Sequence, residues 1–200
     1  MISEKKDIRS LSKEDLRDFF EGLGDKAFRG NQVYEWLWGK GIHSFDDMTN
    51  ISKETRAHLE ANYVINHIEV DSIQKSNDGT IKNAVKLHDG LIVESVLIPT
   101  KKRTTACVSS QVGCSLDCKF CATSRLKRMR NLNPDEIYDQ VVAIDKESRL
   151  YQGIPLSNIV FMGMGEPLMN YKNVLESIDK ITSEEGLGMS PKRITVSTSG

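Results

Sequence analysis

Three of the chain's four cysteines, Cys114, Cys118 and Cys121, stand close together in the spacing C-x₃-C-x₂-C. Thiolates packed this closely in a sequence usually share a metal. A structural zinc site needs four protein ligands, whereas a [4Fe–4S] cluster held by three cysteines keeps one iron free for a substrate or cofactor. Gly113, directly before the first cysteine, allows the tight backbone path of such a loop. We therefore expect an iron–sulfur cluster, with zinc and a fourth ligand from elsewhere as the alternative.

A glycine-containing segment supplies a second candidate site. The segment 163–167 (GMGEP) comes directly after the apolar run 158–162. Ligands bind at the carboxyl ends of the strands in parallel α/β sheets. Glycines let the backbone approach a ligand there, and the carboxylate of Glu166 can accept hydrogen bonds from an ammonium group. Ser197 ends the next strand on the same rim, so Gly165, Glu166 and Ser197 are predicted to bind one ligand.

Two further side chains near the cysteines have useful chemistry. Cys107 ends a strand shortly before the cysteine loop, in a basic setting that favours the thiolate, although a free cysteine is more often a small buried apolar residue. Glu94 interrupts the apolar run 91–98. A carboxylate there either faces solvent on an edge strand or is placed for chemistry, and the alternation of faces along a strand favours the edge.

The second half of the chain must provide the strands that position these loops. Strand, helix, strand, helix and strand are expected in that order at residues 104–109, 134–150, 158–162, 171–183 and 193–197. Asn133 and Pro134 mark the start of the first of these helices. Strands that alternate with helices predict a parallel α/β sheet.

The patterning divides the chain into three parts. Residues 1–65 are expected to form a helical accessory domain, residues 66–98 a β-meander linker, and residues 99–200 the first part of a catalytic α/β domain. In the accessory domain Trp36 is predicted on the apolar face of the second helix, with Trp38 just after it. Tryptophans can stack on bases, but more often they belong to the core.

Composition is that of a soluble globular protein. Apolar residues make up 38% and charged residues 28% of the chain, and the formal net charge is −1. No apolar run reaches membrane-spanning length and no signal peptide is evident, so we expect a cytoplasmic location without a membrane partner. Between residues 101 and 130 the cations are opposed only by Asp117, which suits a phosphate-rich substrate; a solvated basic loop is the plainer interpretation.

Several stretches of the sequence resemble one family of enzymes. They are ESVLIP at 94–99 with Arg103, CVSSQVGC at 107–114, GMGEP at 163–167 and STSG at 197–200. The cysteine spacing is similar to that of the radical S-adenosylmethionine (SAM) enzymes, and the combination resembles the RlmN/Cfr family of ribosomal-RNA adenine methyltransferases. The resemblance implies an open, partial (βα) radical-SAM barrel with a [4Fe–4S] cluster on the three cysteines, and SAM bound by Gly165, Glu166 and Ser197.

The resemblance also implies a reaction. A methyl group would be transferred by radical chemistry to C2 of an adenine in 23S ribosomal RNA and in tRNA, with an electron donor such as a flavodoxin or ferredoxin. Glu94 matches the family's proton acceptor. Cys107 matches the thiol that resolves a covalent protein–RNA adduct by forming a disulfide. The accessory domain would help to hold RNA, with Lys26, Arg29 and Gln32 on the contacting side.

One residue of the family's pattern is missing. No cysteine follows Cys121, whereas the family's methyl-carrying cysteine lies near the C-terminus. Since the strand at 193–197 would also be left with an open edge, we expect the chain to be the first part of a longer protein. The alternatives are a Cfr-like C8 methyltransferase, a radical-SAM activase that installs a glycyl radical on a partner protein, and a zinc-stabilised RNA-binding module.

Overall fold

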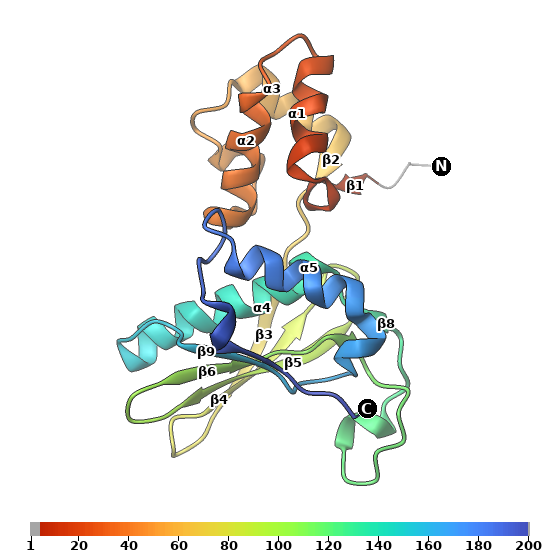
Figure 1. Ribbon diagram of the computed structural model, residues 1–200, viewed down its shortest axis with the longest axis vertical. Helices are drawn as coiled ribbons and strands as arrows, with labels where there is room; N and C mark the ends of the chain where they lie inside the picture. Colours follow the sequence, from red (N-terminus) through yellow and green to blue (C-terminus); the bar gives the residue numbers. More distant parts are fainter. Residues whose placement is uncertain (1–4, 200) are drawn as a thin grey trace. The chain divides into compact units, whose positions relative to one another are not determined.

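The computed structural model describes residues 5–199, which form two compact units (Figure 1). The first unit contains the residues up to Asn66 together with Ser183–Gly188, and the second contains His67–Thr182 together with the segment from Met189. The strands expected as a linker therefore belong to the second unit, while the division into three domains stays a prediction. No helix among residues 5–199 is long and apolar enough to cross a membrane.

The first unit is a helical module in which two of the three α-helices begin at a serine that caps them. Its elements are β1 (Lys6–Asp7), a 3₁₀ helix (Ile8–Ser10), α1 (Lys13–Gly22), α2 (Phe28–Tyr34), a π-helix (Glu35–Gly39), a second 3₁₀ helix (Phe45–Asp47), α3 (Lys53–Asn62) and β2 (Tyr63–Val64), which pairs with β1. Ser12 and Asp15 form a capping box at the start of α1. The Ser52 hydroxyl accepts a hydrogen bond from the Thr55 N–H and caps α3.

The core of this module contains Trp38 rather than Trp36. Trp38 is 1% exposed, whereas Trp36 is partly exposed and donates its indole N–H to the side chain of Asn50. The prediction that Trp36 lies on the apolar face was therefore wrong. A π-helix closes its hydrogen bonds over five residues instead of four, so it rotates the side chains after Tyr34 away from the positions that α-helical spacing predicts.

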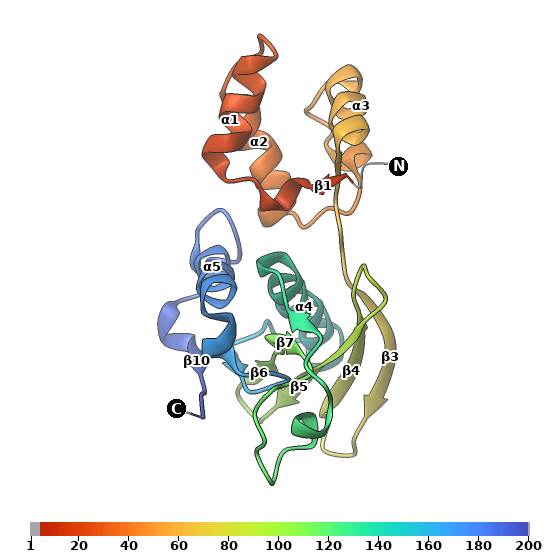
Figure 2. The same cartoon turned by 90° about the vertical axis from the view of Figure 1, so that its right-hand side faces the viewer.

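The second unit is built on one six-stranded sheet in the order β10-β9-β6-β5-β4-β3. Its strands are β3 (Glu69–Lys75), β4 (Ile81–Lys86), β5 (Ile92–Pro99), β6 (Thr104–Cys107), β9 (Asn158–Phe161) and β10 (Ile194–Val196). β6, β9 and β10 run parallel, while β3 to β6 run antiparallel, so the predicted meander continues directly into the parallel strands (Figure 2). The sheet does not close within residues 5–199, in agreement with the partial barrel expected.

Helices α4 (Pro134–Glu147) and α5 (Tyr171–Thr182) cover one face of this sheet (Figures 1 and 2). Strand β5 shows the difference between the two faces, because Val93 and Leu97 are 0% exposed while Glu94 between them is exposed. Burial of each such aliphatic side chain stabilises the fold by about 1.5–3 kcal/mol. The other face of the sheet is left open by the described residues.

The two covering helices follow the predicted pattern with two differences. Asn133 and Glu136 form the capping box at the start of α4, and a π-helix, Ser148–Gln152, follows its last turn. In α5, Leu175 is apolar like Val174 before it, but it is 42% exposed. It lies about 100° around the helix from its buried neighbour Val174, which places it beyond the contact with the sheet. The last strand is also shorter than predicted, because a 3₁₀ helix occupies Pro191–Arg193.

Gly30 marks a close approach between α1 and α2. A Cβ at Gly30 would lie 2.6 Å from the backbone nitrogen of Arg17 and 2.6 Å from the carbonyl carbon of Leu16. Since backbone atoms cannot yield without moving the helix, we predict that Gly30→Ala lowers the free energy of unfolding of this module by about 1–3 kcal/mol. Tryptophan fluorescence can follow this unfolding selectively, because both tryptophans of the chain, Trp36 and Trp38, lie in the module.

Gly22→Ala is the matched control. Nothing lies within 4 Å of a Cβ at Gly22, in the last turn of α1. The free energy of unfolding should stay the same or rise by up to about 1 kcal/mol, because alanine has the higher helix propensity. Equal losses of stability in the two variants would contradict the close helix contact.

Candidate functional site

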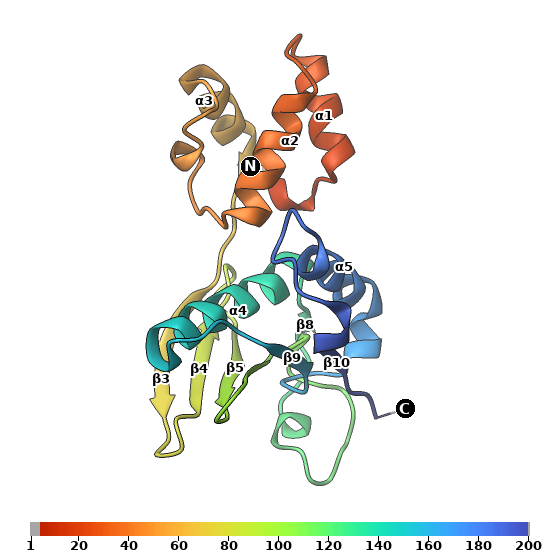
Figure 3. The ribbon, with the colours of Figure 1, turned by 60° about the vertical axis from the view of Figure 1, so that its left-hand side comes forward.

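Two short paired strands close the base of the cysteine loop. β7 (Gln111–Val112) pairs antiparallel with β8 (Arg130–Asn131), and residues 113–129 project between them as a long loop, drawn in green in Figure 3. We call this strand pair the neck of the loop. Gly113 has a positive φ of 73°, and a Cβ there would lie 2.3 Å from the Lys127 carbonyl oxygen. The tight path predicted at Gly113 is therefore present.

A group of ion pairs joins the neck to the start of α4. The guanidinium of Arg130 donates two hydrogen bonds of 2.7 Å to the carboxylate of Glu136 and one of 2.6 Å to Asp89. The hydrogen bonds that Arg130 donates to Glu136 are the main cause of a raised pKa for Arg130. Arg130 was predicted among the cations that face a phosphate-rich substrate, but its charge is used within the protein. Residues 101–103 lie in the turn before β6, at the opposite end of that strand from the cysteine loop.

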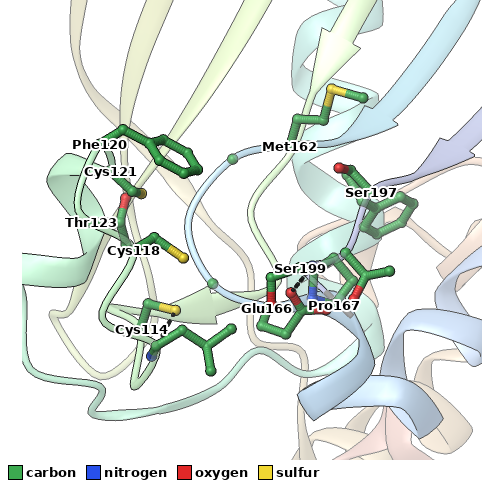
Figure 4. Close-up of a pocket in the computed structure, with 15 residues that line it drawn as sticks. Cys114, Cys118, Phe120, Cys121, Thr123, Met162, Glu166, Pro167, Ser197 and Ser199 are labelled. Carbon is green, nitrogen blue, oxygen red and sulfur yellow. Dashed lines mark hydrogen bonds between the residues drawn. The ribbon is translucent and has the colours of Figure 1, made fainter.

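The three cysteines are partly exposed free thiols on one loop. The sulfur atoms of Cys114 and Cys118 point toward the segment 163–167 (Figure 4). A short 3₁₀ helix, Ala122–Arg125, follows Cys121. The backbone N–H of Ser124 donates to the Cys121 sulfur and lowers the pKa of this thiol. The thiolate, which is the form that binds iron, is thereby favoured.

The loop after β9 forms the opposite wall, and its two glycines pack against the protein's own backbone. A Cβ at Gly163 would lie 2.7 Å from the Val108 carbonyl oxygen. Gly165 has a φ of 93°, and a Cβ there would lie 2.4 Å from the Cβ of Gln111. Glycine is thus required at both positions, although the close neighbour is the chain itself rather than the ligand that was predicted.

Glu166 is 7% exposed and connects this wall to the segment that follows β10 (Ile194–Val196). Its two carboxylate oxygens accept hydrogen bonds from the N–H groups of Leu168 and Ser199, each at 3.0 Å. Burial alone would raise the pKa of Glu166, but these bonds, together with the Thr198 hydroxyl, outweigh the burial and lower it. Glu166 is therefore a buried, ionised carboxylate at the edge of the pocket.

The two walls enclose a pocket of about 340 Å³ (Figure 4), a size that holds a small-molecule ligand. Most of the predicted site residues line it: Cys114, Cys118, Cys121, Gly165, Glu166 and Ser197. Residues distant in the sequence are thus brought together as the motifs suggested. Gly200, the last residue of the STSG stretch, lies outside the described residues.

Glu94 and Cys107 are not in this pocket but share the open face of the sheet. β5 and β6 pair with Val96 opposite Cys107, and alternation along the strand places Glu94 on the same face as Val96. The Glu94 carboxylate lies 3.0 Å from Nζ of Lys82. It faces solvent as expected, but the edge-strand interpretation was wrong, because β5 pairs with β4 on one side and β6 on the other.

The environment of Cys107 also differs from the prediction. Burial raises the pKa of this thiol, and a hydrogen bond from the backbone N–H of Met162 offsets this effect only in part. The neutral thiol is therefore favoured, not the thiolate. The cations that suggested otherwise are near Cys107 in the sequence but occupy exposed loops, while the thiol lies in the sheet.

The residues of the pocket fit an iron–sulfur cluster with a small ligand beside it. Three thiols from one loop face a wall that contains Gly163 and Gly165, and neither glycine has room for a side chain of its own. Among residues 5–199 no three His, Cys, Asp or Glu side chains converge closely enough to ligate a single metal ion. A four-iron cluster takes one cysteine on each of three irons, so it does not require the thiols to converge on one point.

Two residues of the site were not predicted from the sequence. Phe120, between the second and third cysteines, is 94% exposed and lines the pocket (Figure 4). An aromatic residue that stands in the sequence between two metal ligands is held on the metal-binding loop and not in the hydrophobic core. Its position between Cys118 and Cys121 was therefore a usable signal in the sequence. Gln111 is 0% exposed and bonds both to Asn131 in the neck and to Glu166 in the opposite wall. It follows two other polar residues, Ser109 and Ser110, so the sequence gives no signal that distinguishes it.

Comparison with known proteins first establishes the class. Residues 108–200 match the model of the radical SAM superfamily, and residues 6–65 match that of the ribosomal RNA large subunit methyltransferase N-terminal domain. The crystal structure of a radical SAM methyltransferase from Sphaerobacter thermophilus superposes with a TM-score of 0.84 at 36% identity, covering 98% of this chain and 57% of that one. The fold is that of a radical SAM protein.

Within that class the chain belongs to the RlmN/Cfr family and is RlmN-like. A probable dual-specificity RNA methyltransferase RlmN from Flavobacterium johnsoniae is 79% identical over 200 residues, which are 100% of this chain and 57% of that protein. The dual-specificity RNA methyltransferase RlmN of Geotalea uraniireducens is 44% identical over 98% of this chain and 56% of its own length. The chain thus spans little more than half the length of these relatives, and the resemblance seen in its motifs is confirmed.

The half-buried Cys107 thiol should react slowly with iodoacetamide near neutral pH. Within residues 1–200, a variant with Cys114, Cys118 and Cys121 replaced by alanine retains Cys107 as its single cysteine. Because burial raises the pKa of Cys107, the alkylation rate should rise with pH around a midpoint above that of a free cysteine, which is about 8.5. The measurement is the rate between about pH 7 and pH 10, with circular dichroism to show that the variant is folded.

The same variant unfolded in urea is the control for this titration. Its midpoint should return to the free-cysteine value, since unfolding removes the burial. A folded protein whose midpoint lies at or below the unfolded one would contradict the position of Cys107 in the sheet.

Proposed function

We propose that this chain forms the cluster-binding and SAM-binding part of an RNA methyltransferase. The observation that carries the proposal is the single pocket with three cysteines on one side and Gly165, Glu166 and Ser197 on the other. Two findings support RNA as the substrate. Residues 6–65 match an N-terminal domain of ribosomal RNA methyltransferases, and the relatives are described as dual-specificity RNA methyltransferases.

The residues of the pocket would divide the binding between them. Cys114, Cys118 and Cys121 would hold the [4Fe–4S] cluster. With SAM bound, the cluster supplies one-electron cleavage of a carbon–sulfur bond of SAM. The ionised carboxylate of Glu166 has lone pairs left to accept hydrogen bonds from the SAM ammonium group. Phe120 offers an exposed ring on which an adenine can stack, and the Ser197 hydroxyl can donate or accept at the same rim.

The finer reaction that we propose is methyl transfer to C2 of an adenine in 23S ribosomal RNA and in tRNA. C2 of adenine is a poor nucleophile, so a radical route avoids a slow polar transfer. Glu94 would accept the proton that leaves the adenine carbon. Cys107 would form a disulfide with a methyl-carrying cysteine, which is not found between Cys121 and Gly200. Both side chains lie on the open face of the sheet, where a large substrate can reach them.

The partners follow from the same reaction. Because the cluster must be reduced before it can cleave SAM, the proposed partners include an electron donor such as a flavodoxin or ferredoxin. The cytoplasm is the proposed location, since ribosomal RNA and tRNA are found there. The helical module would help to hold RNA, with Lys26, Arg29 and Gln32 on the contacting side; Arg29 and Gln32 already lie within 3.0 Å of each other.

Mass spectrometry of RNA from a deletion strain tests this function. Deleting the gene should remove a C2-methyl mark from an adenine of 23S ribosomal RNA and from tRNA, and the full-length gene should restore both marks. A gene encoding Cys118→Ala should restore neither, because the cluster has lost a ligand. Persistence of every adenine methyl mark in the deletion strain, or loss of a C8 mark instead of a C2 mark, would contradict the proposed reaction.

The rate with purified full-length enzyme tests the role of Glu94. Replacing a general base typically lowers the rate by about 10²–10⁴-fold, and we expect a loss in this range for Glu94→Gln. Glu69→Gln is the matched control, because Glu69 is also an exposed carboxylate of this sheet, 3.9 Å from Nζ of Lys86. It should retain the wild-type rate. Similar rates for the two variants would remove Glu94 from the mechanism.

A further inference from the structure

Gln111 bonds both to the neck of the cysteine loop and to the loop after β9. We propose that it is the positioning residue that holds the loop after β9, residues 163–167, against the neck of the cysteine loop. The inference rests on the proposed function, because it takes SAM to be the ligand of this pocket. Gln111 lies in β7, at the neck of the cysteine loop, and its side chain is 0% exposed. A buried amide in such a position must have hydrogen-bond partners, and the identity of those partners defines its role.

The two ends of the Gln111 side chain bind different segments. Oε1 accepts a hydrogen bond of 2.9 Å from the backbone N–H of Glu166, in the wall opposite the cysteines. Nε2 donates a hydrogen bond of 2.8 Å to Oδ1 of Asn131, on the other strand of the neck. One side chain therefore joins the base of the cysteine loop to the residue whose carboxylate lines the pocket.

A backbone hydrogen bond and a close steric contact with Gln111 fix the loop after β9 at two adjoining residues, Met164 and Gly165. The backbone N–H of Gln111 donates to the Met164 carbonyl oxygen at 3.2 Å. At Gly165 a Cβ would lie 2.4 Å from Cβ and 2.7 Å from Cγ of Gln111, so the loop backbone lies directly against this side chain. Three consecutive loop residues, Met164, Gly165 and Glu166, are thus located by one residue of the neck.

Glu166 transmits this constraint across the pocket. Its backbone is held by Gln111, and its carboxylate accepts the Ser199 N–H at 3.0 Å. A shift of the Glu166 backbone would therefore move both the carboxylate that faces the ligand and the contact to the segment after β10. Correct placement of the SAM-binding groups relative to the cysteines depends on the length and chemistry of the Gln111 side chain.

Only an amide of this length satisfies both neighbours. The side chain must accept a hydrogen bond from Glu166 and donate one to Asn131, and a glutamine does both. Methionine is similar in length but makes neither bond, which leaves the buried Glu166 N–H without this acceptor. Glutamate keeps the acceptor but loses the donor, and it adds a second buried negative charge beside Glu166.

Affinity for SAM measured by calorimetry on anaerobically reconstituted full-length protein tests the proposal. Gln111→Met should raise the dissociation constant for SAM by about tenfold or more, with the iron content per chain unchanged because the cysteines are intact. Gln140→Met is the matched control, since Gln140 is also a 0% exposed glutamine whose side chain bonds the Ser109 backbone from α4. Its dissociation constant should stay within about twofold of wild type.

Hydrogen exchange in the absence of SAM gives a second readout. The Glu166 amide should exchange about tenfold or more faster in Gln111→Met than in wild type, because its acceptor is gone, and it should be unchanged in Gln140→Met. Gln111→Glu, which retains the acceptor, should keep slow exchange at Glu166 and serves if the methionine variant does not fold.

The outcomes separate the two proposals. If the wild-type protein binds no SAM, the proposed function fails, while exchange at Glu166 still decides the role of Gln111. Equal exchange in wild type and Gln111→Met, or equal loss of SAM affinity in Gln111→Met and Gln140→Met, would overturn the positioning role and leave the proposed function standing.

Discussion

The geometry of the pocket depends on the neck of the cysteine loop. Between residues 113 and 129 the loop has no regular structure except one 3₁₀ helix, Ala122–Arg125, so its ends must hold it in place. A two-residue strand pair is not stable by itself. The neck is stabilised by Arg130, which bonds the buried Glu136 at the start of α4, and by Gln111, which bonds the loop after β9. Polar contacts to α4 and to the loop after β9 thus hold the neck, and the neck orients the three thiols.

The parallel strands explain why distant motifs meet at one place. Each of the three segments that form the pocket follows one of the parallel strands. The cysteine loop follows β6, the segment 163–167 follows β9, and the segment 197–199 follows β10. Since the carboxyl ends of parallel strands share one rim of a sheet, the three segments converge there. Glu94 and Cys107 belong instead to the open face of the sheet. The described residues therefore separate a pocket for a small ligand from a face that a large substrate can reach.

Local signals in the sequence were sufficient for much of the fold. Asn133 and Pro134 predicted the start of α4, and the patterning of residues 66–98 predicted the β-meander that contains β3 and β4. The cysteine spacing and the residues 163–167 predicted which segments form the pocket. Trp36 was misplaced because a π-helix interrupts the α-helical period, and periodicity assumes that period throughout.

Features that depend on distant contacts could not be predicted. Glu94 lies on an interior strand because β6, which follows a turn, pairs with β5, and a single strand does not reveal its partners. The pKa of Cys107 is raised by burial in a sheet whose other strands come from far along the chain. Gln111 was overlooked because its partners Asn131 and Glu166 lie 20 and 55 residues away. Sequence patterns identify the reactive groups, whereas the residues that position them become apparent only in the folded chain.

The metal content of the full-length protein after anaerobic reconstitution with iron and sulfide tests the central claim most directly. We expect about four irons and four sulfides per chain, with loss of the cluster in Cys118→Ala and full retention in Cys107→Ala, since Cys107 lies outside the pocket. A colourless protein that contains one zinc per chain, or a cluster that survives Cys118→Ala, would contradict the assignment of the three cysteines.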